Sequence, residues 1–346
     1  MRQTLCYIPE TLFGQPLFGW GWGIGLLVLV VLLSHLYQYV KHRKISGVGD
    51  SMVLLAIGGV MLVFIFPFLA VPEHGVPIRG YGFCLLLAIL AALGLVVYLA
   101  KRQNVSTEKV ITLCFWAVIA GIIGARIFYV TEYWETYLLF HPKTGQFLPL
   151  ESLVAAVNIA DGGITVFGSI LGGMLGALIF MRQNKMPVLP TFDILATAMP
   201  LGSAIGRIGC LLNGCCFGCI TESAWGIVFP IESPAHFHQV EKGLIAAESL
   251  PLPVLPTQIY SSFLALLLCG TLLVLGRLRF YQQRSGLVLA TFMMLYSAGR
   301  FMIEFARNDE ESFFGTGLTI SQNVSIAFFM AGVALFVYVC RNQNKA

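Results

Sequence analysis

GYGFCLLLAILAALGLVVYLA, residues 80–100, is a run of apolar and small side chains without a single charge. A helix that crosses the hydrocarbon core of a bilayer needs about 20 such residues, because each residue advances the helix by only about 1.5 Å. The stretch therefore predicts a membrane-spanning helix. Lys101 and Arg102 follow it directly, and basic residues are enriched where a helix leaves the membrane on the cytoplasmic side.

A similar composition extends over the whole chain of 346 residues, of which 57% are hydrophobic and 11% are charged. Soluble domains carry about 25% charged residues. The mean hydropathy of +0.82 therefore excludes a disordered chain, a coiled coil and an ordinary soluble enzyme. The net charge of +4 gives no electrostatic reason to expect a nucleic acid as partner. The remaining class is a polytopic membrane protein.

Nine stretches are long and apolar enough, or nearly so, to cross a membrane. They are residues 20–40, 51–71, 80–100, 110–130, 163–181, 191–212, 256–278, 287–305 and 319–340. We predict an all-α, polytopic integral membrane protein with about nine transmembrane helices. The first two spans contain no motif, and we interpret residues 1–75 as an accessory N-terminal hairpin. Residues 78–341 then form a seven-helix functional core.

Basic residues gather in alternate connections between the predicted spans. The connection after the first span contains Lys41, Arg43 and Lys44, and the C-terminal tail contains Arg341 and Lys345. The connections on the opposite side hold few basic residues. The positive-inside rule therefore predicts an N-terminus outside the cell and a C-terminus in the cytoplasm.

Arginines also lie where the bilayer disfavours them. Arg126, Arg207 and Arg300 fall within or at the rim of predicted spans, where a charge costs at least about 2.5–3.5 kcal/mol. Glu304 follows Arg300 by four residues on the same helical face, and Arg307 follows by seven. Two structural alternatives stay open: Arg126 reaching toward the lipid headgroups, and Arg300 with Glu304 as an ion pair that only fixes helix register.

Arg207 has no carboxylate at helical spacing. A guanidinium binds phosphate through two parallel hydrogen bonds, and phospholipid phosphate is the abundant anion of a membrane. We therefore favour a phosphate site formed by Arg207 and Arg300.

Glycines mark two further segments. Gly162 and Gly163 precede a helix in which Gly168, Gly172 and Gly176 recur every fourth residue. The recurring glycines predict close helix packing, whereas backbone N–H groups at the first pair suit an anionic headgroup. Residues 206–218, GRIGCLLNGCCFG, place an arginine, an Asn-Gly turn and three cysteines at the predicted outer end of a span.

These motifs resemble those of the prolipoprotein diacylglyceryl transferase family. Its signature Gly-Arg-x-Gly-Asn-x-x-Asn-Gly-Glu-x-x-Gly is matched by Gly206, Arg207, Gly209, Asn213, Gly214 and Gly218. Residues 79–82, 124–126, 256–260 and 300–307 resemble further segments of the family, in the same order. The resemblance covers about residues 78–341 and implies seven core spans in the bacterial cytoplasmic membrane.

The resemblance implies transfer of a diacylglyceryl group from phosphatidylglycerol to the lipobox cysteine of a preprolipoprotein signal peptide. A thioether forms and glycerol phosphate leaves, which is the first step of bacterial lipoprotein maturation. The implied partners are phosphatidylglycerol, preprolipoproteins and membrane lipids. We expect no metal and no cofactor, because the phosphate ester is already a competent leaving group.

Site roles follow from the same resemblance and from the charges. The catalytic residues are expected to be Arg207, Arg300, Glu304 and Tyr81. The substrate-binding residues are expected to be Arg207, Asn213, Gly214, Gly218, Gly162, Gly163, Arg126 and Arg307.

The chain departs from the family pattern at several positions. Cys210 stands where the family usually has Asn, Cys215 where it has Glu, and Phe167 where it has His or Tyr. Leu255 stands where His is common. We therefore expect no single essential base, and the phosphate site should supply most of the rate.

Four cysteines, Cys210, Cys215, Cys216 and Cys219, lie within ten residues. Their spacing is not a standard zinc or cluster spacing, and we expect them to pack as small hydrophobic side chains in preference to a disulfide or a metal site. His236 and His238 are expected to be solvated loop residues.

Two other function classes compete with the transferase. A transporter is disfavoured because no internal repeat is detectable. A catalytically inactive lipid-binding membrane protein stays possible because of Phe167, Cys210 and Cys215.

Overall fold

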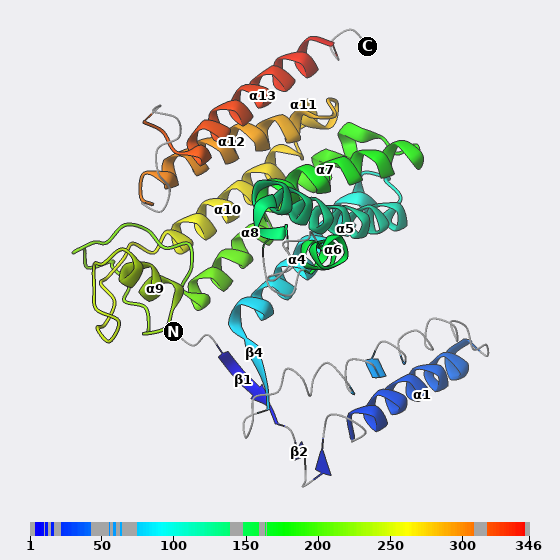
Figure 1. Ribbon diagram of the computed structural model, residues 1–346. Coiled ribbons are helices and arrows are strands. Elements are labelled where there is room, and N and C mark those ends of the chain that lie inside the picture. The colour runs from blue at the N-terminus through cyan, green and yellow to red at the C-terminus, as the bar shows by residue number, and fades with distance from the viewer. Residues whose placement is uncertain are drawn as a thin grey trace. The chain divides into compact units, whose positions relative to one another are not determined.

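The computed structural model describes residues 4–9, 11–12, 15–16, 22–42, 75–138, 148–158, 163, 165–307 and 317–342, together with residues 55, 58, 59 and 63. Among these residues, helices dominate and strands are short. Figure 1 shows the helices and their order along the chain. The prediction of a largely helical, polytopic membrane protein is confirmed.

Seven helices of the described residues are long and apolar enough to cross a membrane. They are α4 (Gly80–Arg102), α5 (Thr107–Glu132), α7 (Val166–Gln183), α8 (Val188–Asn213), α10 (Thr257–Leu275), α12 (Leu287–Glu304) and α13 (Ile320–Asn342). Each corresponds to one predicted span of the core. The seven-helix core therefore has the order that the apolar stretches predicted.

The predicted total of nine spans is not confirmed. The first predicted span coincides with α1 (Trp22–His42), in which Gly23–Leu33 forms a shorter apolar helix. The second, residues 51–71, lies outside the described residues except for single positions. The two-span hairpin therefore stays a prediction.

The connections carry short elements that an apolarity count does not find. These are η2 (Trp134–Tyr137), α6 (Pro149–Val157), α9 (Pro234–Glu241) and α11 (Arg279–Gln282). Strand β1 (Thr4–Ile8) pairs antiparallel with β4 (Val76–Arg79), and β2 (Thr11–Leu12) pairs with β3 (Gln15–Pro16). The pairing joins the start of the chain to the residues directly before α4.

The chain divides into two compact units. One contains Met1–Leu86 and Ile208–Val254, and the other contains Leu87–Arg207 and Leu255–Ala346. The second unit has a hydrophobic core around Leu113, Met181 and Ile194. The first has a smaller one around Phe229, Ala235 and Val254. These two units are defined by packing. The predicted division into an accessory hairpin, residues 1–75, and a functional core, residues 78–341, is defined by function and stays a prediction.

Within the second unit, α5 and α7 pack through small residues, as the glycine repeat predicted. A Cβ atom added at Gly168 would meet the carbonyl oxygen of Gly124, and one added at Gly172 would meet that of Ala120. The two helix backbones are therefore in direct contact at these glycines. Such close approach increases van der Waals packing, which stabilises helix pairs in a membrane, where no hydrophobic effect acts between them.

The start of helix α12 is capped by a carboxylate from another helix. The carboxylate of Asp193, on α8, accepts hydrogen bonds from the backbone N–H groups of Gly286 at 2.6 Å and Leu289 at 2.7 Å. Gly286 is the N-cap residue and has a φ of 95°, a left-handed conformation that favours glycine. Negative charge is favourable at a helix N-terminus. Asp193 thus fixes the start of α12 against α8.

The Asp193 contact can be tested by substitution. Asp193→Ala leaves two N–H groups of α12 without their acceptor, so we expect the free energy of unfolding to fall by roughly 2–3 kcal/mol. Thermal unfolding of the protein in detergent measures the loss. Asp193→Asn keeps one acceptor oxygen and should lose less. An alanine variant that melts with the parent protein would contradict this role.

Candidate functional site

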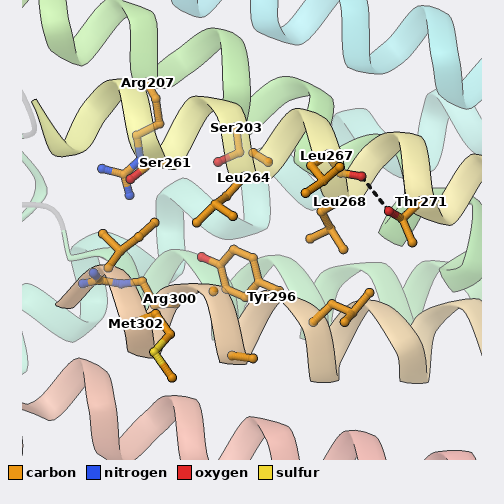
Figure 2. Close-up of a pocket in the computed structure, with 15 residues that line it drawn as sticks. Ser203, Arg207, Ser261, Leu264, Leu267, Leu268, Thr271, Tyr296, Arg300 and Met302 are labelled. Carbon is orange, nitrogen blue, oxygen red and sulfur yellow. Dashed lines mark hydrogen bonds between the residues drawn. The ribbon is translucent and has the colours of Figure 1, made fainter. Parts of the chain in front are cut away.

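The second unit contains a cavity of about 470 Å³ that is lined by α8, α10 and α12. Arg207 of α8 and Arg300 of α12 both line it. Figure 2 shows their guanidinium groups at the same end of the cavity. Helix α10 is tied to α8 by a hydrogen bond of 2.8 Å from the Ser262 hydroxyl to the carbonyl oxygen of Ala204. Two arginines that are far apart in the sequence therefore face one space.

The rest of the cavity wall changes from polar to apolar. Ser203, Ser261 and Tyr296 add hydroxyl groups, whereas Leu264 and Leu268 are apolar. Figure 2 shows the leucines and Thr271 extending away from the arginine end. A cavity with cations at one end and hydrocarbon along its length has the polarity of a phospholipid, with its anionic phosphate and its apolar chains.

Two of these lining residues were not identified from the sequence, although a signal was present. Ser203 precedes Arg207 by four residues, and Tyr296 precedes Arg300 by four residues. Residues four apart lie on the same face of a helix. Once the arginines are chosen, the helical period therefore points to Ser203 and Tyr296 as their neighbours on the cavity wall.

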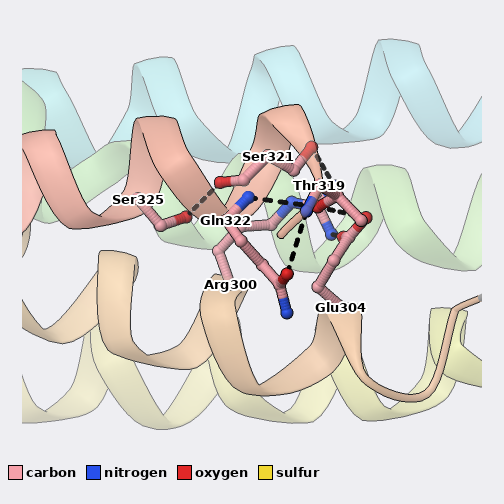
Figure 3. A network of polar contacts seen from close by, with 6 residues as sticks. All are labelled: Arg300, Glu304, Thr319, Ser321, Gln322 and Ser325. Atoms are coloured by element: carbon pink, nitrogen blue, oxygen red, sulfur yellow. Dashed lines mark hydrogen bonds and ion pairs between the residues drawn. The ribbon is translucent and has the colours of Figure 1, made fainter. Parts of the chain in front are cut away.

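Arg300 is held by a polar network between α12 and α13, shown in Figure 3. It forms an ion pair with Glu304, as the spacing predicted, and it donates a hydrogen bond of 2.9 Å to the Ser321 hydroxyl. The Glu304 side chain is 1% exposed. The carboxylate also accepts a hydrogen bond of 3.3 Å from the Thr319 hydroxyl. These contacts fix the direction of the Arg300 guanidinium.

The network begins where α13 begins. The backbone N–H of Thr319 donates to the Gln322 side chain at 3.0 Å, and the N–H of Gln322 donates to the Thr319 hydroxyl at 3.2 Å. This reciprocal pair is a capping box. Thr319 therefore serves two purposes, since its hydroxyl starts α13 and also holds the carboxylate that holds Arg300.

Arg207 differs from Arg300 in its contacts. Among the residues that the structure describes, no carboxylate forms an ion pair with Arg207, whereas Arg300 pairs with Glu304. The side chain of Arg207 is half-buried and lines the cavity. Its charge is therefore available to an anion in the cavity.

Arg126 is buried, with 7% of its surface exposed. Its guanidinium donates hydrogen bonds to the carbonyl oxygens of Ala155, Ala156 and Gly163, at 2.9, 2.7 and 2.9 Å. The first two carbonyls belong to the last turn of α6, where a cation is favourable. This geometry differs from a side chain that reaches out to the lipid headgroups.

The Arg126 guanidinium lies so close to Gly163 that it leaves no room for a side chain there. A Cβ atom at Gly163 would meet the Tyr129 ring and the Arg126 guanidinium, so only glycine allows this approach. Gly162 lies outside the described residues. The roles of Gly162, Gly163 and Arg126 in substrate binding stay predictions.

The remaining predicted residues lie elsewhere. Arg307 lies beyond the end of α12, which ends at Glu304, so the argument from a shared helical face does not apply to it. Tyr81, Asn213, Gly214 and Gly218 fall in the first unit. There, the ring of Tyr81 lies beside Gly209 of α8. Their roles in catalysis and substrate binding stay predictions.

The turn after α8 is tightly packed. Gly214 has a φ of 79°, and a Cβ atom there would lie 3.1 Å from the Phe229 ring and 3.2 Å from the Cβ of Ser233. The N–H groups of Gly214 and Cys215 both donate to the carbonyl oxygen of Cys210. The Asn-Gly turn signal is thus explained by a left-handed residue that ends the helix.

All nine cysteines lie in the described part of the chain and carry thiols, not disulfides. Cys210, Cys215, Cys216 and Cys219 are half-buried. Hydrogen bonding with Cys210 lowers the pKa of the Cys215 thiol, but hydrogen bonding with Cys216 and burial raise it, and the pKa lies above its ordinary value. The thiol of Cys215 is therefore protonated near neutral pH.

The prediction of solvated histidines is wrong for His236, which is 3% exposed. The reason is that the segment folds into helix α9, which Ser233 caps by accepting a hydrogen bond from the His236 N–H at 3.2 Å. The ring Nδ1 of His236 accepts a hydrogen bond of 3.3 Å from the backbone N–H of Glu232. His238 is half-buried.

Among the described residues, seven apolar helices and a cavity with arginines at one end are the features of an integral membrane protein that is suited to an amphipathic anion. A family model described as prolipoprotein diacylglyceryl transferase matches residues 69–338. The chain belongs to this family of membrane transferases.

Similar proteins with the name phosphatidylglycerol–prolipoprotein diacylglyceryl transferase occur in several bacteria. The one from Rhodopirellula baltica is 33% identical over 266 residues, which are 73% of this chain and 52% of the relative. The second such protein of Clostridium perfringens is 31% identical over 271 residues, 78% of this chain and 93% of the relative. One from a Nostoc species is 34% identical over 273 residues, 76% of this chain and 87% of the relative. The chain thus spans about half of the first relative and most of the other two.

The ion pair of Arg300 with Glu304 can be tested with a double-mutant cycle. Glu304→Gln leaves a guanidinium inside the protein without its counter-charge, so the free energy of unfolding should fall by about 3 kcal/mol. Arg300→Met combined with Glu304→Gln should cost less than the sum of the single losses. Ser321→Ala removes only a hydrogen bond and should cost about 1 kcal/mol. Thermal unfolding in detergent measures all four variants, and strictly additive losses would mean that the two side chains act independently.

Proposed function

We propose that this chain transfers the diacylglyceryl group of phosphatidylglycerol to the thiol of a lipobox cysteine in a preprolipoprotein. The observation that carries the proposal is the pairing of Arg207 and Arg300 at one end of a cavity with apolar walls. Membership of the prolipoprotein diacylglyceryl transferase family supports it, as do the names of the relatives.

In the proposed reaction the sulfur of the cysteine attacks the glyceryl carbon that carries the phosphate. A carbon–sulfur bond forms, the carbon–oxygen bond to phosphate breaks, and glycerol phosphate leaves with the electron pair of that bond. The thiol gives up its proton to solvent before the attack, since the thiolate is the nucleophile and a free cysteine has a pKa of about 8.5. The products are a thioether and glycerol phosphate.

Negative charge grows on the leaving phosphate during this step. Fixed cations at that position stabilise the transition state more than the bound substrate, and this difference accelerates the reaction. We assign this task to Arg207 and Arg300. Glu304 is a positioning residue, because a carboxylate that is paired with a guanidinium is a weak base.

We propose that the other predicted residues contribute to binding. Tyr81 and Asn213 have polar groups that can orient the headgroup by hydrogen bonds. Gly214, Gly218, Gly162, Gly163, Arg126 and Arg307 complete the proposed substrate-binding set. The motifs that carry these residues support this assignment.

The proposed setting is the bacterial cytoplasmic membrane, with the N-terminus outside and the C-terminus in the cytoplasm. The alternation of basic residues between connections supports this orientation. It places the residues after α8 on the outer side, where exported preprolipoproteins present their lipobox cysteine.

Arg207 provides the decisive test of this function. Arg207→Ala should abolish transfer, and Arg207→Lys should restore little of it, because a point charge cannot form the two parallel hydrogen bonds of a guanidinium. The assay uses purified full-length protein, phosphatidylglycerol and a synthetic lipobox peptide, and mass spectrometry detects the thioether-linked diacylglycerol.

Size-exclusion elution and thermal unfolding of each variant provide the control for folding. A folded Arg207→Ala variant with full activity would refute the phosphate site. A parent protein that binds phosphatidylglycerol but forms no thioether would instead identify the chain as an inactive lipid-binding protein.

The N-terminal residues give a second test. We propose that residues 1–75 anchor the protein and take no part in catalysis, so a chain that begins at Pro77 should keep measurable transfer. This chain lacks β1 and therefore the partner of β4, so we expect lower thermal stability but not a loss of turnover. A folded, correctly oriented and wholly inactive truncated protein would show that the hairpin belongs to the site.

A further inference from the structure

Three thiols converge at the end of α8. The sulfur atoms of Cys210, Cys215 and Cys216 all lie within 4.8 Å of one another. Cys210 belongs to the last turn of the helix, and the other two follow the turn at Gly214. No other His, Cys, Asp or Glu of the described residues joins this group.

The convergence depends on an unusual backbone. Adjacent side chains normally point in different directions, but Cys216 has a φ of 58°. A residue other than glycine in this left-handed region is strained and persists only where its surroundings impose it. Here Gly214, also left-handed, packs against Phe229 and Ser233 and anchors the turn. The fold therefore holds Cys215 and Cys216 together on the side of Cys210.

We propose that Cys210, Cys215 and Cys216 bind one thiophilic metal ion of the Zn²⁺ or Cu⁺ class through three thiolates. Thiolates are the ligands that select these ions among the common biological metals. Each thiol releases its proton when it becomes a ligand. A metal–sulfur bond of about 2.3 Å requires sulfur atoms roughly 4 Å apart around one ion. The three sulfur atoms lie within 4.8 Å of one another, which is compatible with this requirement.

The site has two structural consequences. Three protein ligands leave Cu⁺ trigonal or leave Zn²⁺ one position for water, because the described residues supply no fourth ligand in this group. The bound ion would also link the last turn of α8 to the residues after it, on both sides of Asn213 and Gly214. Metal binding should therefore stiffen the segment that carries the family motif.

The experiment uses the full-length protein, purified in detergent under reducing conditions and stripped of metal. Titration with Zn²⁺, and separately with Cu⁺, should show one ion bound per chain, and Co²⁺ should give a thiolate-to-metal charge-transfer band. Cys210→Ser and Cys215→Ser should each lower the affinity at least tenfold. Cys219→Ser is the matched control, because Cys219 is near in sequence but lies outside the group.

A further variant separates metal binding from folding. Cys216→Gly removes one thiol and suits the left-handed backbone, so it should fold at least as well as the parent and still lose the metal. Added Zn²⁺ should raise the melting temperature of the parent protein but not that of Cys216→Gly. Equal metal binding by the parent protein and by Cys216→Gly, which lacks one of the three thiols, would overturn the proposal. So would the absence of binding, or a disulfide between any two of these cysteines in protein taken from native membranes.

Discussion

A guanidinium that is placed among apolar helices must find an electrostatic partner, because the hydrocarbon core of the bilayer offers it none. The three arginines within the spans meet this constraint in three ways. Arg126 is satisfied by backbone carbonyls near the end of α6, and Arg300 is satisfied in part by Glu304 and Ser321. Arg207 lines the cavity and forms no ion pair with a described carboxylate. From Arg126 through Arg300 to Arg207, the guanidinium therefore has fewer protein partners and is more available to an anion in the cavity.

The contact between Asp193 and Gly286 explains why the two cavity arginines lie at the same level along α8 and α12. Arg207 lies fourteen residues after Asp193 on α8, and Arg300 lies fourteen residues after Gly286, the N-cap of α12. At about 1.5 Å per residue, both helices advance by about 21 Å from that contact. Equal advance along α8 and α12 brings both guanidiniums to one end of the same cavity (Figure 2). A single capping carboxylate thus sets the register of a site that lies about four turns away.

Apolarity and spacing sufficed to predict the seven core spans and the pairing of Arg300 with Glu304, since both depend on residues that are near in sequence. The glycine repeat predicted close helix packing, but the partner segments of contacts between helices were not predictable in this way. The α6 carbonyls that receive Arg126, the helix start that receives Asp193, and the Ser321 hydroxyl all come from other segments. The convergence of Cys210, Cys215 and Cys216 was missed for a different reason, because it depends on one left-handed residue, and no side-chain pattern reports a backbone dihedral of that kind.

The charges of the cavity also explain how the proposed transfer can proceed without a dedicated base. Arg207, Arg300 and Glu304 together carry one net positive charge, which a phosphodiester with one negative charge neutralises. As the carbon–oxygen bond breaks, the leaving phosphate gains a second negative charge. Glu304 already neutralises much of the field of Arg300, so the added stabilisation falls chiefly to Arg207. Phe167, which stands on α7 without an acid–base group, then costs the reaction little, because the barrier is lowered at the leaving group and the small thiolate fraction is consumed as it forms.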